Sequence, residues 1–257
     1  MDELIKKVAD QIRESNWTVA LTGAGISVDS GIPDFRSPGG LWTRFDPYEY
    51  ATIDAFRADP EKVWTMINEM HGIVSRAKPN PGHIALAQME ELGYLKAVVT
   101  QNIDNLHQDA GNKRVIEFHG NAKQLVCLED GKKYSADSFE GSTSPPRCEC
   151  GRILKPDVVL FGEAIPIRAS IEAQHEAQEC NVMLVIGTSA MVAPASSIPV
   201  MAKSTGGVVI EVNPNNTPLT GAISDCIIHG SASEVLPRIV EHLKDEKKSN
   251  GRKWPWK

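Results

Sequence analysis

"LTGAGISVDSGIPDFRSPGGLW", Leu21 to Trp42, directly follows the apolar run Trp17-Thr18-Val19-Ala20. A strand that ends in Gly23-Ala24-Gly25 allows a tight turn, and the start of the helix expected after it offers free N–H groups to a pyrophosphate. Val28 stands where the usual dinucleotide-binding pattern has a third glycine. Taken alone, this Gly-x-Gly turn is explained equally well as a plain loop.

The loop that follows the turn changes this balance. Gly31-Ile32-Pro33-Asp34-Phe35-Arg36 combines a flexible glycine, a rigid proline, an acid, an aromatic ring and a guanidinium. Few structural loops need that set of side chains, whereas a lid over a phosphate-bearing ligand could use each of them. The segment therefore predicts a site for a phosphate-bearing cofactor.

The remaining apolar runs predict an α/β fold. An amphipathic helix is expected near the N-terminus, where Leu4, Ile5, Val8 and Ile12 recur at helical spacing. Continuous β-branched runs suit strands that are covered on both faces, as in a parallel sheet. Such runs lie at 97–100, 182–186, 207–212 and 226–228.

Two stretches interrupt this rhythm. Residues 43–78 have a helical pattern without a strand-like run, and residues 122–155 contain three of the five cysteines and few core residues. We expect both insertions to form a small helical and zinc-ribbon-like lobe. The discontinuous segments 1–42, 79–121 and 156–257 would form a Rossmann-like, cofactor-binding domain. The charged tail from Lys244, which ends in Trp254-Pro255-Trp256, is expected to fray.

Composition excludes several classes of protein. The formal net charge is −6, whereas a nucleic-acid-binding protein normally carries a basic stripe, so no direct nucleic-acid binding is expected. An acidic surface suits basic partners, such as lysine-rich protein segments. No apolar run approaches the roughly 20 residues that span a bilayer, so no membrane association is expected. The cysteine usage and the lack of a signal peptide favour a cytoplasmic protein.

Six segments, in this order, resemble a known family. They are 23–27 (GAGIS), 31–36 (GIPDFR), 101–107 (QNIDNLH), 118–120 (FHG), 159–163 (VLFGE) and 187–189 (GTS). Val212-Asn213 and residues 230–235 extend the match to nearly the whole chain. The chain resembles the sirtuin family of NAD-dependent protein deacylases.

The resemblance implies a cleft between two lobes that holds NAD and an acyl-lysine peptide. In the implied reaction, the acyl-lysine carbonyl oxygen attacks the ribose carbon that bears nicotinamide, nicotinamide leaves, and an alkylamidate of ADP-ribose remains. A ribose hydroxyl then attacks the amidate carbon, and water releases free lysine and O-acyl-ADP-ribose. Because a neutral amide is a poor nucleophile, the enzyme must hold the reactants in line, which is worth on the order of 7 kcal/mol or more.

His119 is the implied general base. An isolated histidine between Phe118 and Gly120 is more often a packed or surface residue than a catalyst. This one follows the strand-like run 115–118, and the end of a strand in an α/β sheet is where such sites form. Histidine alone has an unperturbed pKa near neutrality, so it can accept a proton from a ribose hydroxyl at cellular pH.

Asn102 is the second implied catalytic residue and would contact the reacting ribose. Asp104 and the Ile103 backbone would recognise nicotinamide, Arg36 would face phosphate, and Phe35 would shield the reacting carbon. Asn102 or Asp104 could instead cap the next helix, and Ser27 could be an ordinary helix cap. The implied NAD-binding residues are Gly23, Ala24, Gly25, Ser27, Asp34, Phe35, Arg36, Gln101, Asn102, Ile103, Asp104, Gly187, Thr188, Ser189, Asn213 and Ala232.

The acyl-lysine protein or peptide is expected to lie between two segments. Backbone pairing with an extended peptide gives affinity with little sequence preference. Phe161 and Val159 could equally be core residues. The residues implied are Val159, Leu160, Phe161, Gly162 and Glu163 on one side and Met191 and Val192 on the other.

The cysteines depart from the family pattern of two Cys-x-x-Cys pairs. Cys127 has Asp130 where its partner cysteine belongs, and Cys148-Glu149-Cys150 is one residue short. Three thiolates and a carboxylate could still bind zinc. The Cys-x-Cys spacing strains the chelate, however, so the sequence predicts a weak, degenerate zinc site.

Two other functions remain open: mono-ADP-ribosyl transfer to a protein side chain, and a non-catalytic NAD-sensing module.

The expected acyl preference rests on two side chains that this sequence lacks. Sirtuins that remove succinyl or malonyl groups carry a tyrosine and, three residues later, an arginine, where this chain has Ile67 and Met70. Neither side chain can pair with a carboxylate, so acetyl or longer apolar acyl groups are expected.

Overall fold

The computed structural model describes residues 1–139 and 144–249, with the backbone alone for 245–249. A six-stranded parallel sheet in the order β3-β2-β1-β7-β8-β9 forms the centre of the larger lobe. Its strands are β1 (Thr18–Thr22), β2 (Leu95–Thr100), β3 (Val115–Glu117), β7 (Val182–Ile186), β8 (Val208–Val212) and β9 (Cys226–Ile228). The predicted parallel α/β fold and each predicted strand run are confirmed.

The strand order reverses between β1 and β7, which pair in register from Thr18↔Val182 to Thr22↔Ile186. Counted along the main sheet, the order is that of the dinucleotide-binding folds, which place their ligand outside the carboxyl ends of the strands at this reversal. Every residue of β1 and β7 is buried, which explains why both strands are continuous apolar runs.

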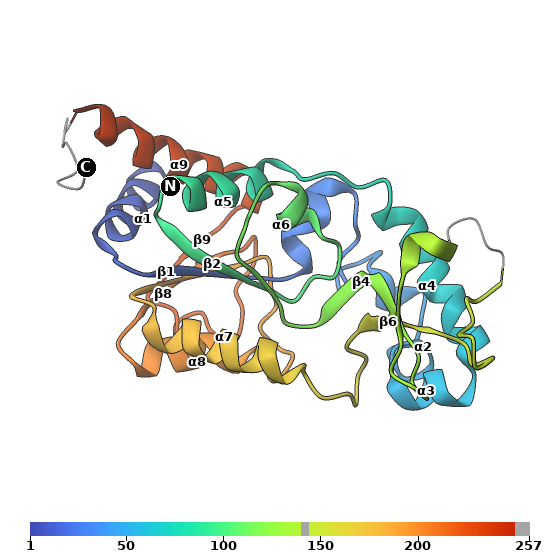
Figure 1. The fold of residues 1–257 in the computed structure, drawn as a ribbon. Coiled ribbons are helices and arrows are strands. Elements are labelled where there is room, and N and C mark those ends of the chain that lie inside the picture. Colours follow the sequence, from blue (N-terminus) through green and yellow to red (C-terminus); the bar gives the residue numbers. More distant parts are fainter. Residues whose placement is uncertain (140–143, 250–257) are drawn as a thin grey trace, which may run out of the picture.

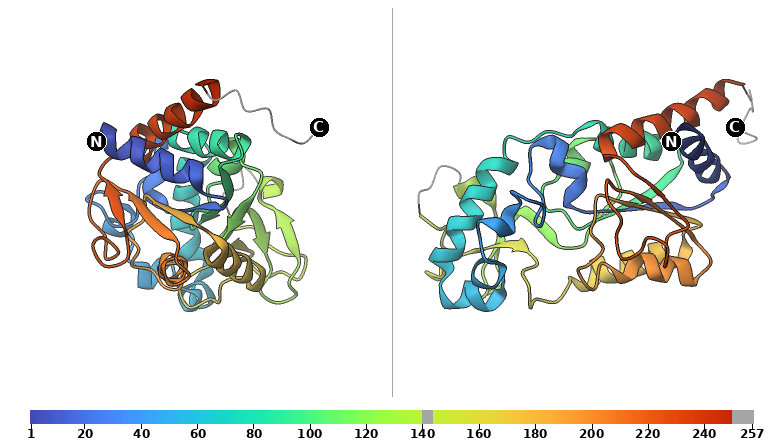
Figure 2. Two further views of the ribbon diagram at one scale, coloured as in Figure 1. Left: turned by 90° about the vertical axis from the view of Figure 1, so that its left-hand side faces the viewer. Right: turned by 180° about the vertical axis from the view of Figure 1, so that it is seen from behind.

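Helices cover both faces of this sheet (Figures 1 and 2). One face packs against α1 (Asp2–Glu14), α5 (Pro81–Glu91) and α9 (Ala232–Ser249), and the other against α7 (Ile167–Glu179) and α8 (Ser197–Ser204). The short helix α6 (Leu106–Asp109) follows β2. The predicted N-terminal helix is confirmed, since Ile5, Val8 and Ile12 of α1 are fully buried.

The smaller lobe lies at one end of the molecule (Figure 1). A three-stranded antiparallel sheet, in the order β5-β4-β6, packs there against helices of the first insertion. The Trp64 indole donates to the Leu154 carbonyl at 2.9 Å and so joins the two insertions. The lobe contains η2 (Leu41–Thr43), α2 (Pro47–Tyr50), α3 (Ile53–Ala58), α4 (Pro60–Val74), β4 (Gly120–Val126), β5 (Lys133–Ser135), η3 (Ala136–Phe139) and β6 (Lys155–Val158).

Two segments add detail to the expectations. The helix expected after β1 is a 3-10 helix, η1 (Ala24–Ser30), and its first residues lie against the backbone of Gly187. Helix α9 continues past Lys244 and ends at Ser249. The expected loop residues 140–143 and the tail 250–257, with Trp254-Pro255-Trp256, lie outside the described residues. In the part of the chain that is described, no helix is long and apolar enough to cross a membrane.

Candidate NAD and acyl-lysine site

The turn after β1 and the turn after β7 touch at the strand-order reversal. The Gly25 amide donates to the Gly187 carbonyl at 2.7 Å. A Cβ atom on Gly25 would lie 2.7 Å from that carbonyl oxygen, and one on Gly187 would lie 2.3 Å from the Ile26 nitrogen. Gly187 also has a φ of +58°, a region that glycine adopts without cost. Both glycines are therefore needed for this close backbone approach, and Gly23 is similarly confined, since a Cβ atom there would lie 2.8 Å from Thr188 Cβ.

Polar side chains join the ends of the neighbouring strands to these turns. Gln101, after β2, donates through Nε2 to Thr188 Oγ1 at 3.1 Å. Asn213, after β8, donates through Nδ2 to the Thr188 carbonyl at 2.8 Å. Ser189 is exposed, and Ala232 is buried at the start of α9. The carboxyl ends of β1, β2, β7 and β8 thus converge on one edge of the sheet.

Asn102, Ser27 and Asp104 form a connected group beside the Gly23 turn. Asn102 donates through Nδ2 to Ser27 Oγ at 3.1 Å and to the Gly23 carbonyl at 3.2 Å. Ser27 Oγ donates to Asp104 Oδ2 at 2.7 Å, while Asp104 Oδ1 accepts the Leu106 amide at 2.9 Å. Asp104 therefore caps the start of α6 and also faces the site. Ser27 lies inside η1 and is not its cap.

Two buried histidines lie beneath this group. His83 Nε2 is 3.5 Å from Ser27 Oγ, and the rings of His83 and His107 are 4.9 Å apart. Burial lowers the pKa of His83 to about 4, although the Asp104 charge opposes the shift. Burial, with the neighbouring His83, lowers the pKa of His107 to about 3. Both rings are neutral at pH 7 and support the site through hydrogen bonds.

His119 lies after β3, at the same edge of the sheet. Its Nδ1 is 3.1 Å from the Gln101 carbonyl, which can only accept a hydrogen bond, so Nδ1 carries the proton and Nε2 keeps a free lone pair. Burial lowers the pKa of the His119 imidazole below its usual value, against the opposing effect of this hydrogen bond. The ring is therefore held neutral, in the tautomer that can accept a proton at Nε2.

The loop 31–40 is folded on itself. Asp34 Oδ1 accepts the backbone amides of Arg36 and Ser37 at 3.1 and 2.8 Å. This leaves the Arg36 side chain exposed and the Phe35 ring 38% exposed, 5.1 Å from the Trp42 ring. The Asp34 carboxylate thus serves the loop itself and turns Phe35 and Arg36 outward.

The segment expected to bind a peptide is attached to both lobes. The Val159 amide donates to the His119 carbonyl at 2.8 Å. Phe161 exchanges backbone bonds with the first insertion, accepting from Ile53 at 3.0 Å and donating to Ala51 at 2.9 Å. Leu160 is buried, but the Phe161 side chain is 43% exposed and Met191, on the opposite segment, is 66% exposed. Phe161 is thus not a core residue.

The structure brings the Asp130 carboxylate together with the three cysteines of the small lobe. Ligand atoms of Cys127, Asp130, Cys148 and Cys150 all lie within 4.8 Å of one another. The Cys127 and Cys150 sulfurs are 3.6 Å apart, and Cys148 Sγ is 3.5 Å from Asp130 Oδ2. A zinc tetrahedron, with Zn–S near 2.3 Å and Zn–O near 2.1 Å, has S–S edges of about 3.8 Å and S–O edges of about 3.6 Å. The donor set therefore fits a zinc ion.

The shortened Cys-x-Cys spacing does not separate the thiols. Cys127 begins one tight turn and Cys148 the other, and each turn contains a glycine with positive φ, Gly131 at +71° and Gly151 at +86°. Asp130 and Cys150 both directly precede these glycines. The second turn is one residue tighter, and it still brings Cys150 back to the cluster.

Several residues at the site were not predicted from the sequence. They are Asn80, His83 and His107 beneath Asp104, Trp42 beside Phe35, and Lys155, whose buried ammonium bonds the Glu163 carboxylate. The Asn80-Pro81-Gly82-His83 capping pattern and a lone lysine before an apolar run were signals for two of them.

The sheet has the strand order of the dinucleotide-binding folds, with glycine turns at its reversal. A half-buried histidine lies at the same edge, beside a smaller lobe that carries the cysteines. These features together define a dinucleotide-dependent enzyme with two lobes. The sequence profile described as "Sir2 family" matches residues 23–194. The chain belongs to the Sir2 family, and the predicted membership is confirmed.

Named relatives cover almost the whole chain. It is 43% identical over 245 residues to "NAD-dependent protein deacylase 1" of Archaeoglobus fulgidus, an alignment that covers 95% of this chain and 98% of that protein. It is 46% identical over 246 residues to "NAD-dependent protein deacetylase 1" of Pyrobaculum aerophilum, which covers 95% and 96%.

Solved structures agree with the fold. A complex of a Sir2 homologue with NAD superposes with a TM-score of 0.88 at 43% identity, over 93% of this chain and 94% of that one. A Sir2 variant with a deacetylated p53 peptide and an O-acetyl ADP-ribose gives 0.87 at 38% identity, over 92% and 97%. The predicted Rossmann-like fold with a smaller lobe is that of these structures.

Proposed function

We propose that this protein removes acetyl, or longer apolar acyl, groups from protein lysine side chains with NAD as co-substrate. The products are nicotinamide, O-acyl-ADP-ribose and free lysine. The observation that carries this proposal is the state of His119, whose Nδ1 is bonded to the Gln101 carbonyl and whose Nε2 is free beside the Asn102 loop. Names of relatives that share over 40% of their residues with this chain support it.

We assign roles to the NAD-facing residues on this basis. The turns at 23–25 and 187–189 would receive phosphate and ribose through backbone amides and the Thr188 and Ser189 hydroxyls. Arg36 would neutralise phosphate charge, and Phe35 would cover the reacting carbon. Asn213 and Ala232 would hold the adenosine end. NAD supplies the ADP-ribosyl group that takes up the acyl group.

The reacting end would be held by the connected group beside η1. Asp104 and the Ile103 backbone would bind the nicotinamide carboxamide, and Asn102 would orient the ribose. His119 would accept the proton of a ribose hydroxyl at Nε2. The acyl-lysine stem would pass the exposed Phe161 and Met191, with the peptide backbone along 159–163 and Met191-Val192.

We also propose the following organisation and setting. Cys127, Asp130, Cys148 and Cys150 would hold a structural zinc ion in a small lobe made of 43–78 and 122–155, with the other segments forming the NAD-binding domain. The protein would act in the cytoplasm on acyl-lysine proteins, without binding nucleic acid or membrane. Its net charge of −6 favours basic, lysine-rich partners.

Incubation with NAD and an acetyl-lysine peptide, followed by mass spectrometry, tests the function. We expect free-lysine peptide, nicotinamide and O-acetyl-ADP-ribose in equal amounts. A peptide that gains ADP-ribose on a side chain, with its acetyl group retained, would indicate the mono-ADP-ribosyltransferase alternative. NAD bound but not consumed would indicate the NAD-sensing module. Either result would overturn the deacylase assignment.

A further inference from the structure

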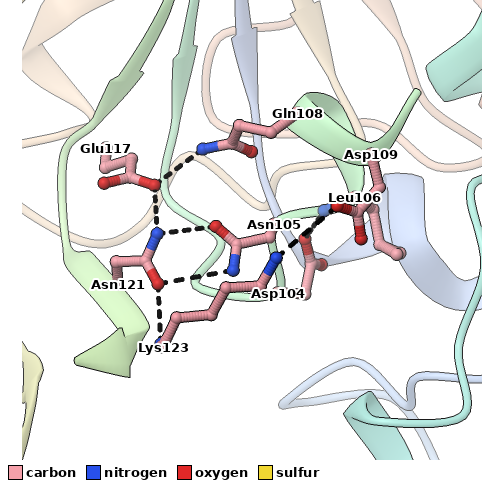
Figure 3. A network of polar contacts seen from close by, with 8 residues as sticks. All are labelled: Asp104, Asn105, Leu106, Gln108, Asp109, Glu117, Asn121 and Lys123. Carbon is pink, nitrogen blue, oxygen red and sulfur yellow. Dashed lines mark hydrogen bonds and ion pairs between the residues drawn. The ribbon is translucent and has the colours of Figure 1, made fainter. Parts of the chain in front are cut away.

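A closed group of polar side chains joins the two segments that carry the proposed catalytic residues (Figure 3). Glu117 Oε1 accepts hydrogen bonds from Gln108 Nε2, at 2.6 Å, and from Asn121 Nδ2. Asn121 Nδ2 also donates to Asn105 Oδ1 at 2.6 Å, and Asn105 Nδ2 donates back to Asn121 Oδ1 at 3.4 Å. We call Asn105, Gln108, Glu117 and Asn121 the bracket.

The bracket has a definite place in the chain. Asn105 follows Asp104 directly, so it ends the loop proposed to hold nicotinamide and ribose. Glu117 and Asn121 lie two residues before and two residues after His119. One backbone bond runs parallel to the bracket, from the Ala122 amide to the Ile103 carbonyl at 3.4 Å, which is long for such a bond. Beyond the sheet edge, where the Phe118 amide donates to the Thr100 carbonyl at 2.9 Å, the 2.6 Å bond between Asn121 and Asn105 is the shortest link between the two segments.

The bracket also holds an unusual backbone. Asn105 has a φ of +62°, in the left-handed region that asparagine tolerates better than most residues. Its side chain is only slightly accessible and makes no cap bond to α6. Outside the bracket, Lys123 and Asp109 form an ion pair at 3.5 Å, and the Lys123 amide donates to Asn121 Oδ1 at 2.7 Å. Asn121 is thus bonded both within the bracket and to the Lys123 backbone.

The nicotinamide side has anchors that do not involve the bracket. Asn102 is bonded to Gly23 and Ser27, and Asp104 is bonded to Ser27. The His119 side is anchored by its Nδ1 bond to the Gln101 carbonyl and by the Val159 amide on its own carbonyl. The Phe118 amide also donates to the Thr100 carbonyl at 2.9 Å, and Gly120 pairs with Val158. Loss of the bracket would leave both segments attached to their sheets but remove the side-chain contact that fixes one against the other.

We propose that Glu117, acting through Asn121 and Asn105, is a positioning residue that sets His119 against the Asn102–Asp104 loop. The proposal rests on the deacylase function above. The step that releases nicotinamide depends on the loop, whereas the later step, in which a ribose hydroxyl attacks, depends on His119. A displacement of about 1 Å can cost on the order of 100-fold in rate, so the second step should suffer selectively.

The two steps can be read separately in one sample. Before His119 acts, the first step is reversible, and labelled nicotinamide can re-enter NAD. Exchange of labelled nicotinamide into NAD, in the presence of an acetyl-lysine peptide, reports the first step, and formation of O-acetyl-ADP-ribose reports the second. The ratio of exchange to deacylation is the quantity to compare, because a general loss of folded enzyme leaves this ratio unchanged.

Glu117→Ala removes the acceptor shared by Gln108 and Asn121. We expect deacylation to fall at least about tenfold more than exchange. Glu117→Gln keeps an oxygen that can accept both bonds, and its ratio should return to within about twofold of the wild type. Asn121→Ala should raise the ratio in the same direction and serves if Glu117→Ala folds poorly. Glu172→Ala, in an exposed pair with Arg168, is the matched control.

An unchanged ratio in both Glu117→Ala and Asn121→Ala, with the two rates falling together, would show a merely structural role and overturn the proposal. Failure of the wild type to give either exchange or deacylation is a different result, since it would overturn the deacylase function and the bracket's role with it. A raised ratio in Glu117→Gln as large as that in Glu117→Ala would also contradict the geometry, because the hydrogen bonds would then not be the cause.

Discussion

Lys155 Nζ lies 3.0 Å from Glu163 Oε2, and only 4% of the lysine side chain is exposed. The same ammonium donates to the carbonyl of Val158 at 2.6 Å, while Glu163 Oε2 also accepts the Leu160 amide at 2.8 Å. This buried pair therefore closes the segment 158–163 from both ends. The Glu163 carboxylate is engaged within its own loop.

Lys155→Met should loosen the proposed peptide-binding segment. A buried ion pair that loses one partner typically costs 3–5 kcal/mol, because the other charge is left uncompensated. We expect the KM for an acetyl-lysine peptide to rise at least about tenfold, whereas the KM for NAD changes little. Adding Glu163→Gln removes the stranded charge and keeps an acceptor for Leu160, so the double variant should recover part of the loss. Equal changes in both KM values would contradict this role.

His119→Ala should abolish deacylation while NAD binding, measured by calorimetry, stays within about threefold of the wild type. In the wild type, burial holds the His119 pKa below its usual 6.5. Because the neutral ring is the active form, the rate should fall only as the pH drops through that lowered pKa, and the acid limb of kcat should lie below pH 6.5. His175→Ala, at an exposed histidine, is the control. Wild-type turnover by His119→Ala would remove the assigned role.

Acid should destabilise the fold through His83 and His107. Their folded pKa values, about 4 and about 3, lie below the unfolded value near 6.5. The unfolded state therefore binds more protons, so their contribution is complete above pH 6.5 and is lost as the pH falls. From pH 7 to pH 5, each should cost about 2 kcal/mol of unfolding free energy.

Denaturant titrations of the wild type, His107→Gln and the exposed control His71→Gln measure this effect. The loss between pH 7 and pH 5 should shrink by about 2 kcal/mol in His107→Gln and stay unchanged in His71→Gln. The same loss in all three proteins would mean that His107 does not remain neutral in the fold.

Acetyl-lysine should be cleaved much faster than succinyl-lysine. Ile67 and Met70 are partly buried, and both pack against core clusters of the small lobe. Neither can compensate a buried acyl carboxylate, which costs several kcal/mol, so we expect at least about 100-fold lower kcat/KM on a matched succinyl peptide. Ile67→Tyr with Met70→Arg should narrow the gap. An equal or higher efficiency of the wild type on the succinyl peptide would refute the assignment.

Zinc should be bound below one equivalent when the protein is purified without added metal. The exposed Asp130 carboxylate is a weaker zinc ligand than the thiolate it replaces. Metal analysis should show near-full occupancy in Asp130→Cys and lower occupancy in Asp130→Ala. Glu149→Ala, at an exposed acid paired with Lys132, should match the wild type. A full equivalent in the wild type that persists in Asp130→Ala would exclude Asp130 as a ligand.

The sequence predicted much of this fold because its strands are buried on both faces and therefore read as continuous apolar runs. It could not predict which side chains meet across the sheet edge. Asn105 and Asn121 contact each other only because α6 and β4 lie side by side, and nothing in either local pattern marks the pair. The sequence also does not show how Cys150 reaches the other cysteines across the shortened spacing, which depends on the left-handed turn at Gly151.

The contact between Gly25 and Gly187 also restricts how this chain can change over generations. A side chain added at either position meets backbone atoms of the other turn, so no smaller neighbour can make room for it. A substitution at one of these positions therefore cannot be compensated by a substitution at the other. We expect a library with random residues at both positions to return glycine pairs among its folded members.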